Sequence, residues 1–211
     1  MSVSNLEILV EEPSMEAFLR ELLPRILGGR LDFQIHSYLS KDDLLKKLPQ
    51  RLRGYSRWLP DDWRIVVIVD RDDDDCVALK QRLEEMAARA GLRTRSSVGR
   101  LAWQLVNRVA VEELEAWYFG DWEAVRKVYP RVPGTIPNRA GFRDPDVIHG
   151  GTWERLENIL QKAGYFPTGL RKIELARALG GLIEPNRNRS HSFAVFRDVL
   201  NEIAPRSTPT N

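Results

Sequence analysis

The sequence has 211 residues, of which 43% are hydrophobic and 29% charged, and its formal net charge is +2. This length supports one domain with a sizeable core, and the composition excludes a disordered chain. No apolar run reaches the about 20 residues that span a bilayer, and the single cysteine, Cys76, excludes an intramolecular disulfide. We therefore expect a cytoplasmic protein without a membrane partner. The three histidines lack the spacing of zinc ligands.

The first part of the sequence alternates strand and helix patterns. Residues 6–10 form a short apolar strand pattern, and residues 15–23 carry apolar side chains at helical spacing. Residues 33–39 alternate with a period of two, as an edge strand does. Residues 41–52 form an amphipathic helix, on which Lys41 to Lys47 are expected to be exposed. This order is typical of an α/β sheet covered by helices.

The next apolar run carries the first candidate site. Five β-branched residues, 65–69, precede Asp70 and Asp72, two carboxylates spaced i, i+2. Such a run is typical of a strand buried on both faces of a parallel sheet, where ligands bind beyond the carboxyl ends of the strands. Two mutually repelling carboxylates there indicate a hard divalent cation such as Mg²⁺. The alternative is that these acids only cap the next helix and face water, a role that we assign to the acids at 73–75.

A second acidic residue is expected at the same edge of the sheet. Glu11 directly follows the strand pattern at 6–10, where a helix begins. Because the carboxyl ends of parallel strands lie along one edge, we expect Glu11 to lie near Asp70. Acids supplied by two strands form a more specific pattern than either motif alone.

The later part of the chain continues this pattern and then becomes helical. A helix is predicted for residues 75–90, followed by two strands, one of them at 103–111. That strand runs into a helix beginning near Glu112, on which Glu112 and Glu115 share a face. The alternative for these acids is a solvated first turn that interacts with the helix dipole.

The distribution of proline and glycine predicts the domain boundaries. Residues 129–151 are rich in Pro, Gly, Asn and Asp, and we take them as a linker. It separates a sheet domain at 1–128 from a C-terminal helical extension at 152–204. Three short helices are predicted in this extension, at 153–163, 170–179 and 193–203. Residues 205–211 are expected to form a frayed tail.

Two of these motifs resemble the Toprim domain, the metal-binding module of topoisomerases, bacterial primases, recombination proteins and nucleases of the overcoming-lysogenisation-defect type. Leu9-Val10-Glu11-Glu12-Pro13 is similar to its first motif, and Val69-Asp70-Arg71-Asp72 is similar to its Asp-x-Asp motif. The resemblance covers about the first 125 residues. It implies a Toprim-like Rossmannoid fold, with a mostly parallel central sheet flanked by helices. One departure is Glu12, which stands where the family commonly has glycine.

Within that superfamily the chain is most similar to a Toprim-like family often encoded beside ATPases in bacterial defence loci. In that group a Glu-x-Trp element follows the sheet, and Glu115-Ala116-Trp117 resembles it. The resemblance implies Glu115 as a third metal ligand and Glu112 as a weaker fourth. Toprim-like nucleases often carry a lysine near the metal, and Lys172, which opens a predicted helix, is the matching candidate. The alternative for Lys172 is an exposed basic residue at a helix start.

The function implied by this resemblance is cleavage of nucleic-acid phosphodiester bonds with one or two Mg²⁺ or Mn²⁺ ions. The implied ligands and catalytic groups are Glu11, Asp70, Asp72, Glu115, Glu112 and Lys172. Glu11 is the candidate general acid or base, because flanking carboxylates and burial raise its proton affinity. The expected partners are DNA ahead of RNA and an ATPase protein of an anti-phage defence system, and a homo-oligomer is left open.

Two alternatives stay open. One is a non-catalytic Toprim-like subunit that binds nucleic acid or assembles a complex, which Glu12 and the acid-crowded loop favour. The other is a phosphatase of the haloacid-dehalogenase type, whose Asp-x-Asp motif also follows an apolar strand. Its nucleophile usually lies on the first strand and is followed by small hydroxyl residues, whereas Arg71 and Asp73 flank Asp72 here.

Overall fold

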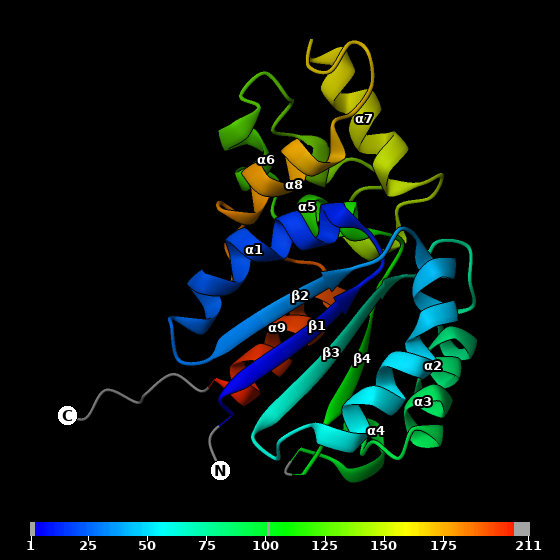
Figure 1. The fold of residues 1–211 in the computed structure, drawn as a ribbon. Coiled ribbons are helices and arrows are strands. Elements are labelled where there is room, and N and C mark those ends of the chain that lie inside the picture. Colours follow the sequence, from blue (N-terminus) through cyan, green and yellow to red (C-terminus); the bar gives the residue numbers. More distant parts are fainter. Residues whose placement is uncertain (1–2, 101, 205–211) are drawn as a thin grey trace, which may run out of the picture.

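The computed structural model describes residues 3–100 and 102–204. Four parallel strands form one sheet in the order β2-β1-β3-β4, and helices cover both of its faces (Figure 1). The strands are β1 (Asn5–Val10), β2 (Asp32–Ser37), β3 (Trp63–Asp70) and β4 (Leu105–Ala110). The predicted α/β class, with a parallel central sheet flanked by helices, is confirmed.

The helices account for most of the remaining chain. In order they are α1 (Pro13–Leu27), α2 (Lys41–Trp58), α3 (Cys76–Arg89), α4 (Arg95–Val98), α5 (Leu114–Gly120), α6 (Trp122–Val128), η1 (Ile136–Asn138), η2 (Pro145–Val147), α7 (Thr152–Lys162), α8 (Lys172–Gly180) and α9 (His191–Ile203). Helix α2 continues to Trp58, beyond its predicted end at residue 52, because Tyr55 still faces the core. Among the described residues, no helix is both long and apolar enough to cross a membrane.

The region after α3 differs from the prediction. Two strands were expected there, but within the described residues only β4 joins the sheet. Residues 95–98 form the short helix α4 instead, and the Thr94 side chain caps it by accepting a hydrogen bond from the backbone N–H of Ser97. Thr94 makes only an isolated bridge to Leu105. Local caps of this kind compete with strand pairing, and here the cap prevails.

Side chains alternate across the sheet, so the strands contribute to two apolar cores. Leu6, Ile8 and Val10 of β1 face the core formed with α1, α8 and α9. Leu9 of β1 and Val67 of β3 face the other core, which is closed by α2 and α3. Figure 1 shows these two groups of helices on opposite sides of the sheet. Burial on both faces explains why residues 65–69 of β3 are an uninterrupted apolar run.

The C-terminal helices pack on the same core as β1 and α1. Helix α8 approaches α1 so closely that a Cβ on Gly180 would stand 2.3 Å from the carbonyl oxygen of Phe18. Phe193 and Phe196 of α9 pack against Trp117 of α5. The linker and extension boundaries stay predictions, and the predicted frayed tail lies outside the described residues.

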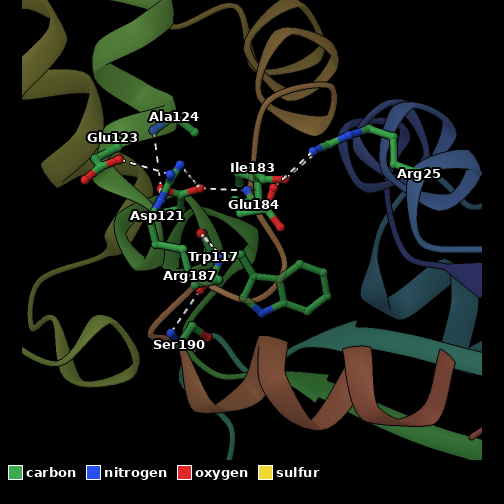
Figure 2. Close-up of polar contacts among 10 residues, drawn as sticks. Arg25, Trp117, Asp121, Glu123, Ala124, Ile183, Glu184, Arg187 and Ser190 are labelled. Carbon is green, nitrogen blue, oxygen red and sulfur yellow. Dashed lines mark hydrogen bonds and ion pairs between the residues drawn. The ribbon is translucent and has the colours of Figure 1, made fainter. Parts of the chain in front are cut away.

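An ion pair between the buried Asp121 and the partly exposed Arg187 fixes the chain segment between α8 and α9. The Asp121 side chain is 1% exposed and accepts hydrogen bonds from Arg187 Nε at 2.8 Å and from the backbone N–H of Glu184 at 2.7 Å (Figure 2). Beside it, Asn188 Nδ2 donates to the carbonyl oxygen of Trp117 at 2.8 Å. These contacts join the end of α5 to the segment that leads into α9.

Candidate functional site

The carboxyl ends of β1 and β3 bring Glu11 and Asp70 into contact. Glu11 follows β1 directly, and Asp70 ends β3, the neighbouring strand. Glu11 Oε2 accepts a hydrogen bond from the backbone N–H of Asp70 at 2.9 Å. Glu11 is 7% exposed and Asp70 is 4% exposed. Burial raises the pKa of Glu11 from 4.5 to about 7, although the hydrogen bond from Asp70 opposes the rise.

The Asp70 carboxylate has an unused oxygen. Its Oδ1 is buried and has no hydrogen-bond partner among the described residues. Burial raises the pKa of Asp70 well above its usual range, and the charges of Glu11, Glu12 and Glu115 raise it further. A buried carboxylate oxygen without a donor is costly, so it indicates a ligand that this chain does not itself supply.

Asp72 lies at the outer side of this group and pairs with a lysine. Its backbone is left-handed, with φ 47°, and its N–H donates to the carbonyl oxygen of Glu112 at 2.9 Å. Lys41 Nζ lies 2.6 Å from Asp72 Oδ2 and 2.9 Å from Asp74 Oδ2. The Lys41 side chain is only 13% exposed, so the prediction that it is exposed is wrong. Because β2 ends at the same edge as β1, the first residue of α2 comes beside the acids.

Glu115 enters the group from the first turn of α5. It is 2% exposed, which contradicts the alternative of a solvated first turn. Burial raises its pKa from 4.5 to about 7, while the charge of Lys172 lowers it. Glu115 in turn raises the pKa of Asp70, so the two carboxylates belong to one electrostatic group.

Lys172 reaches the acids from a distant part of the chain. It is the first residue of α8, and its Nζ lies 5.1 Å from the centroid of the Trp153 ring. Burial lowers the pKa of Lys172, but the negative charges of Glu115 and nearby carboxylates outweigh burial and raise it above its ordinary value. The lysine that the resemblance suggested is therefore within the field of the buried acids.

Glu112 does not share a helix face with Glu115, and that prediction is wrong. Helix α5 begins at Leu114, and Glu112 precedes it with φ 62° and pairs with Arg71. A left-handed residue cannot continue a right-handed helix. The next residue, Glu113, accepts hydrogen bonds from the Thr152 hydroxyl at 2.7 Å and from the backbone N–H of Trp153 at 3.0 Å, at the start of α7. Glu112 thus lies at the outer side of the group of acids, where the Arg71 guanidinium already pairs with it.

Sequence reasoning missed two members of this group, Lys41 and Tyr118. Tyr118 is buried on α5, and its hydroxyl has no hydrogen-bond partner among the described residues. Burial raises its pKa well above the usual range, and Glu115, one turn earlier on α5, raises it further. The i, i+3 spacing of the two residues is the signal that would have identified Tyr118.

Two surface cavities lie beside the group of acids, and Glu11 is the buried acid that lines one of them. One has a volume of about 490 Å³ and is lined by Glu11, Glu12, Lys41 and Asp72, among others. The second has a volume of about 430 Å³ and also includes Asp72, together with residues 149–151. Both volumes fall within the range of ligand pockets, about 300–1,000 Å³. The cavities therefore reach Glu11 and Asp72 at the outer side of the group, whereas Asp70 and Glu115 lie buried behind them.

The donor atoms fit a hard divalent cation, although no complete cage is preformed. Every candidate ligand atom is a carboxylate oxygen, the donor that Mg²⁺ and Mn²⁺ prefer. In residues 3–100 and 102–204, no three His, Cys, Asp or Glu side chains are arranged to hold an ion. Mg²⁺ often takes only one or two protein carboxylates and keeps several waters. Asp70, with its free oxygen beside Glu11, meets that requirement.

Comparisons with known proteins give a family without an assigned activity. A family model described as "Domain of unknown function (DUF4276)" matches residues 10–204. No curated protein and no solved structure matches the chain.

Proposed function

We propose that this chain, which belongs to the family described as "Domain of unknown function (DUF4276)", is a nuclease that uses Mg²⁺ or Mn²⁺. The proposal joins the Toprim-like motifs of the sequence to the position of their acids on the folded chain. DNA is the proposed substrate ahead of RNA. An ATPase is the proposed partner, on the resemblance to families encoded beside ATPases.

The observation that carries the proposal is the free Oδ1 of Asp70 within a group of buried acids. Above neutral pH, raised pKa values of several carboxylates lower the stability of the folded protein, because these groups ionise more readily in the unfolded chain. Groups with such shifts are concentrated at functional sites. A divalent cation would stabilise the ionised forms of Glu11, Asp70 and Glu115 together, which explains why the fold keeps them adjacent.

The side chains present suit the cleavage of a phosphodiester. A bound Mg²⁺ or Mn²⁺ would polarise the phosphate and make its bound water more acidic. Asp70 and Glu11 would hold the ion, and the negative charges of Glu115 and Asp72 close by would add to its attraction. The ammonium group of Lys172 would stabilise negative charge on the phosphate oxygens. Glu11 is also the proposed general acid or base; its pKa of about 7 is that of the metal-free protein, and a bound cation would lower it.

Plasmid nicking by the purified protein tests this proposal. We expect Mn²⁺- or Mg²⁺-dependent conversion of supercoiled DNA, which chelation with EDTA abolishes. The variants Asp70→Asn and Glu11→Gln should lose about 100-fold or more of this activity, since a metal contributes several kcal/mol to the transition state. Asp61→Asn is the matched control, because Asp61 precedes the opposite end of β3.

The outcomes separate the proposal from its alternatives. Full activity in both site variants rejects the assignment of the acids. DNA binding without nicking in any divalent cation overturns the nuclease and favours the non-catalytic subunit. Hydrolysis of p-nitrophenyl phosphate that requires Asp70, with no nicking, favours the phosphatase.

A further inference from the structure

A separate polar pocket lies on the α2 face of the sheet, between the edge strand β2 and α2. Its volume is about 610 Å³, and it is lined in part by Glu7, His36, Arg51 and Trp58. Glu7 precedes Glu11 by four residues on β1, a separation of about 13 Å along a strand. The acidic residues of the candidate metal site do not line this pocket.

The strand alternation of β2 leaves this face polar. Phe33 and Ile35 point into the core shared with α1. Gln34 and His36 therefore face the opposite side, in register with Glu7 and Leu9 of β1. The apolar core beneath α2 ends before this part of β2 is covered, and the pocket occupies the space that remains.

Helix α2 contributes a glycine where packing does not require one. Gly54 lies inside α2 and lines the pocket, and a Cβ built on it would meet no atom within 4 Å. A glycine in a helix interior costs about 1 kcal/mol relative to alanine. The side chain of any larger residue at position 54 would enter the pocket, so glycine keeps the space open at a cost to the helix.

The charges in the pocket favour an anion. Glu7 is buried and already satisfied, since its Oε2 accepts a hydrogen bond from the Tyr55 hydroxyl at 2.6 Å and lies 2.7 Å from His36 Nε2. Lys47 pairs with Asp43 at 2.7 Å. Arg51 contacts His36 and Tyr55, but no carboxylate of the described residues lies within 4 Å of it. Its guanidinium charge is therefore free for an anionic ligand.

The pocket also offers an exposed aromatic surface. Trp58 is 54% exposed, although it is a large apolar side chain. The centroids of the Trp58 and Trp63 rings are 5.6 Å apart in an edge-to-face arrangement, and this contact holds the Trp58 ring in place. An exposed indole beside cationic groups is a stacking surface for a nucleobase. The side-chain amides of Gln34 and Gln50 add hydrogen-bond donors and acceptors for a base edge.

We propose that this pocket binds a nucleoside phosphate, with the base stacked on Trp58 and the phosphate at Arg51. A free mononucleotide and one nucleotide of a single strand present the same chemistry. A cationic ligand fits less well, because the Glu7 carboxylate is satisfied and the Arg51 charge repels it. The inference concerns binding and does not depend on cleavage at the acidic site.

Isothermal titration calorimetry in EDTA tests the proposal directly. The probes are AMP, GMP, CMP and UMP, and separately a single-stranded hexadeoxynucleotide. We expect saturable binding that Gly54→Leu and Arg51→Gln weaken by about tenfold or more, since tenfold corresponds to about 1.4 kcal/mol. Gly54→Ala leaves most of the space, and Arg53→Gln makes the same charge change outside the pocket. Both controls should bind within about twofold of the unmodified protein.

Each outcome has a defined meaning. Binding of mononucleotides identifies a free nucleotide as the source, and binding of the hexanucleotide alone identifies a single strand. The absence of saturable binding for every probe overturns the proposal, as does affinity unchanged in both pocket variants. Inorganic phosphate that binds as tightly as AMP would also overturn it, because the base would then contribute nothing. Unchanged AMP binding in Asp70→Asn would separate this pocket from the proposed nuclease site.

Discussion

Glu11 and Glu115 come from elements far apart in the chain, yet burial raises the pKa of both from 4.5 to about 7. The folded state therefore holds their protons more tightly than the unfolded state does. The contribution of these two protonated side chains to the free energy of unfolding is fully present below about pH 4.5 and is lost as the pH rises through about 7. In the metal-free protein these two residues oppose folding at alkaline pH.

Replacing Glu115 with glutamine should remove its share of this pH dependence. We compare the free energy of unfolding of Glu115→Gln with that of the unmodified protein in EDTA. From pH 5 to pH 8 this difference should shift in favour of the variant by roughly 2–3 kcal/mol, since one pKa unit corresponds to about 1.4 kcal/mol. For a chain of this size the gain is several degrees in Tm. Thermal melts followed by circular dichroism at both pH values measure it.

The comparison between the two proteins cancels the titration of the histidines, which both contain. Addition of Mg²⁺ at pH 8 should raise the Tm of the unmodified protein more than that of Glu115→Gln, because a cation stabilises the ionised acids. If the Tm of both proteins depended on pH in the same way, Glu115 would ionise as freely in the folded state as in the unfolded one.

At the residue level, local pattern predicted the acids but not their partners. Glu11 and Asp70 follow strand patterns that can be recognised in short windows, and parallel strands place their ends together. Lys41 depends on where α2 begins relative to the sheet, and no local pattern contains that information. The left-handed backbone of Glu112 likewise occurs where this residue contacts Arg71 and Asp72, which follow the end of β3 and are distant in sequence.

At the scale of elements, periodicity identified the strands and helices that bury one or two faces. The uninterrupted run in β3 and the amphipathic helices α7 and α9 were predicted within a few residues of their observed ends. The prediction of a further strand before β4 was wrong because the Thr94 side chain caps a short helix there, and such a local contact does not appear in the hydrophobic pattern. The close approach of α1 and α8 was also outside the prediction, since it depends on a glycine between two helices.

Gly180 permits that approach, and alanine should disrupt it. A Cβ at this position would lie 2.3 Å from the carbonyl oxygen of Phe18, a backbone atom that moves only with α1. We expect Gly180→Ala to destabilise the protein by about 1–3 kcal/mol, as overpacking does. Urea denaturation measures the free energy of unfolding.

The neighbouring glycine supplies the control. A Cβ on Gly181 would meet only the carbonyl oxygen of Ala178, at 4.0 Å, and its φ of −72° suits any residue. Gly181→Ala should therefore change stability by less than about 0.5 kcal/mol. Equal effects of the two substitutions would show that α1 and α8 tolerate a wider separation.

At the scale of the molecule, the apolar core does not stop at the predicted end of the sheet domain. The core above β1 includes Leu156 of α7, Leu175 of α8 and Phe196 of α9, all fully buried. Without these helices, the face of the sheet that α1 partly covers would expose apolar surface to water. The linker composition that predicted a boundary after residue 128 reports turns and loops, and it carries no information about which helices share a core.

A fragment of residues 1–128 should therefore fail to fold on its own. We expect it to unfold without a cooperative transition and to bind the dye ANS, because the surface normally covered by α8 and α9 becomes exposed. A fragment of residues 1–204 retains α7, α8 and α9, which share this core, and should melt in one cooperative transition. Differential scanning calorimetry of both fragments makes the comparison. A cooperative transition in residues 1–128 would establish an autonomous sheet domain, with the C-terminal helices added to it as a separate extension.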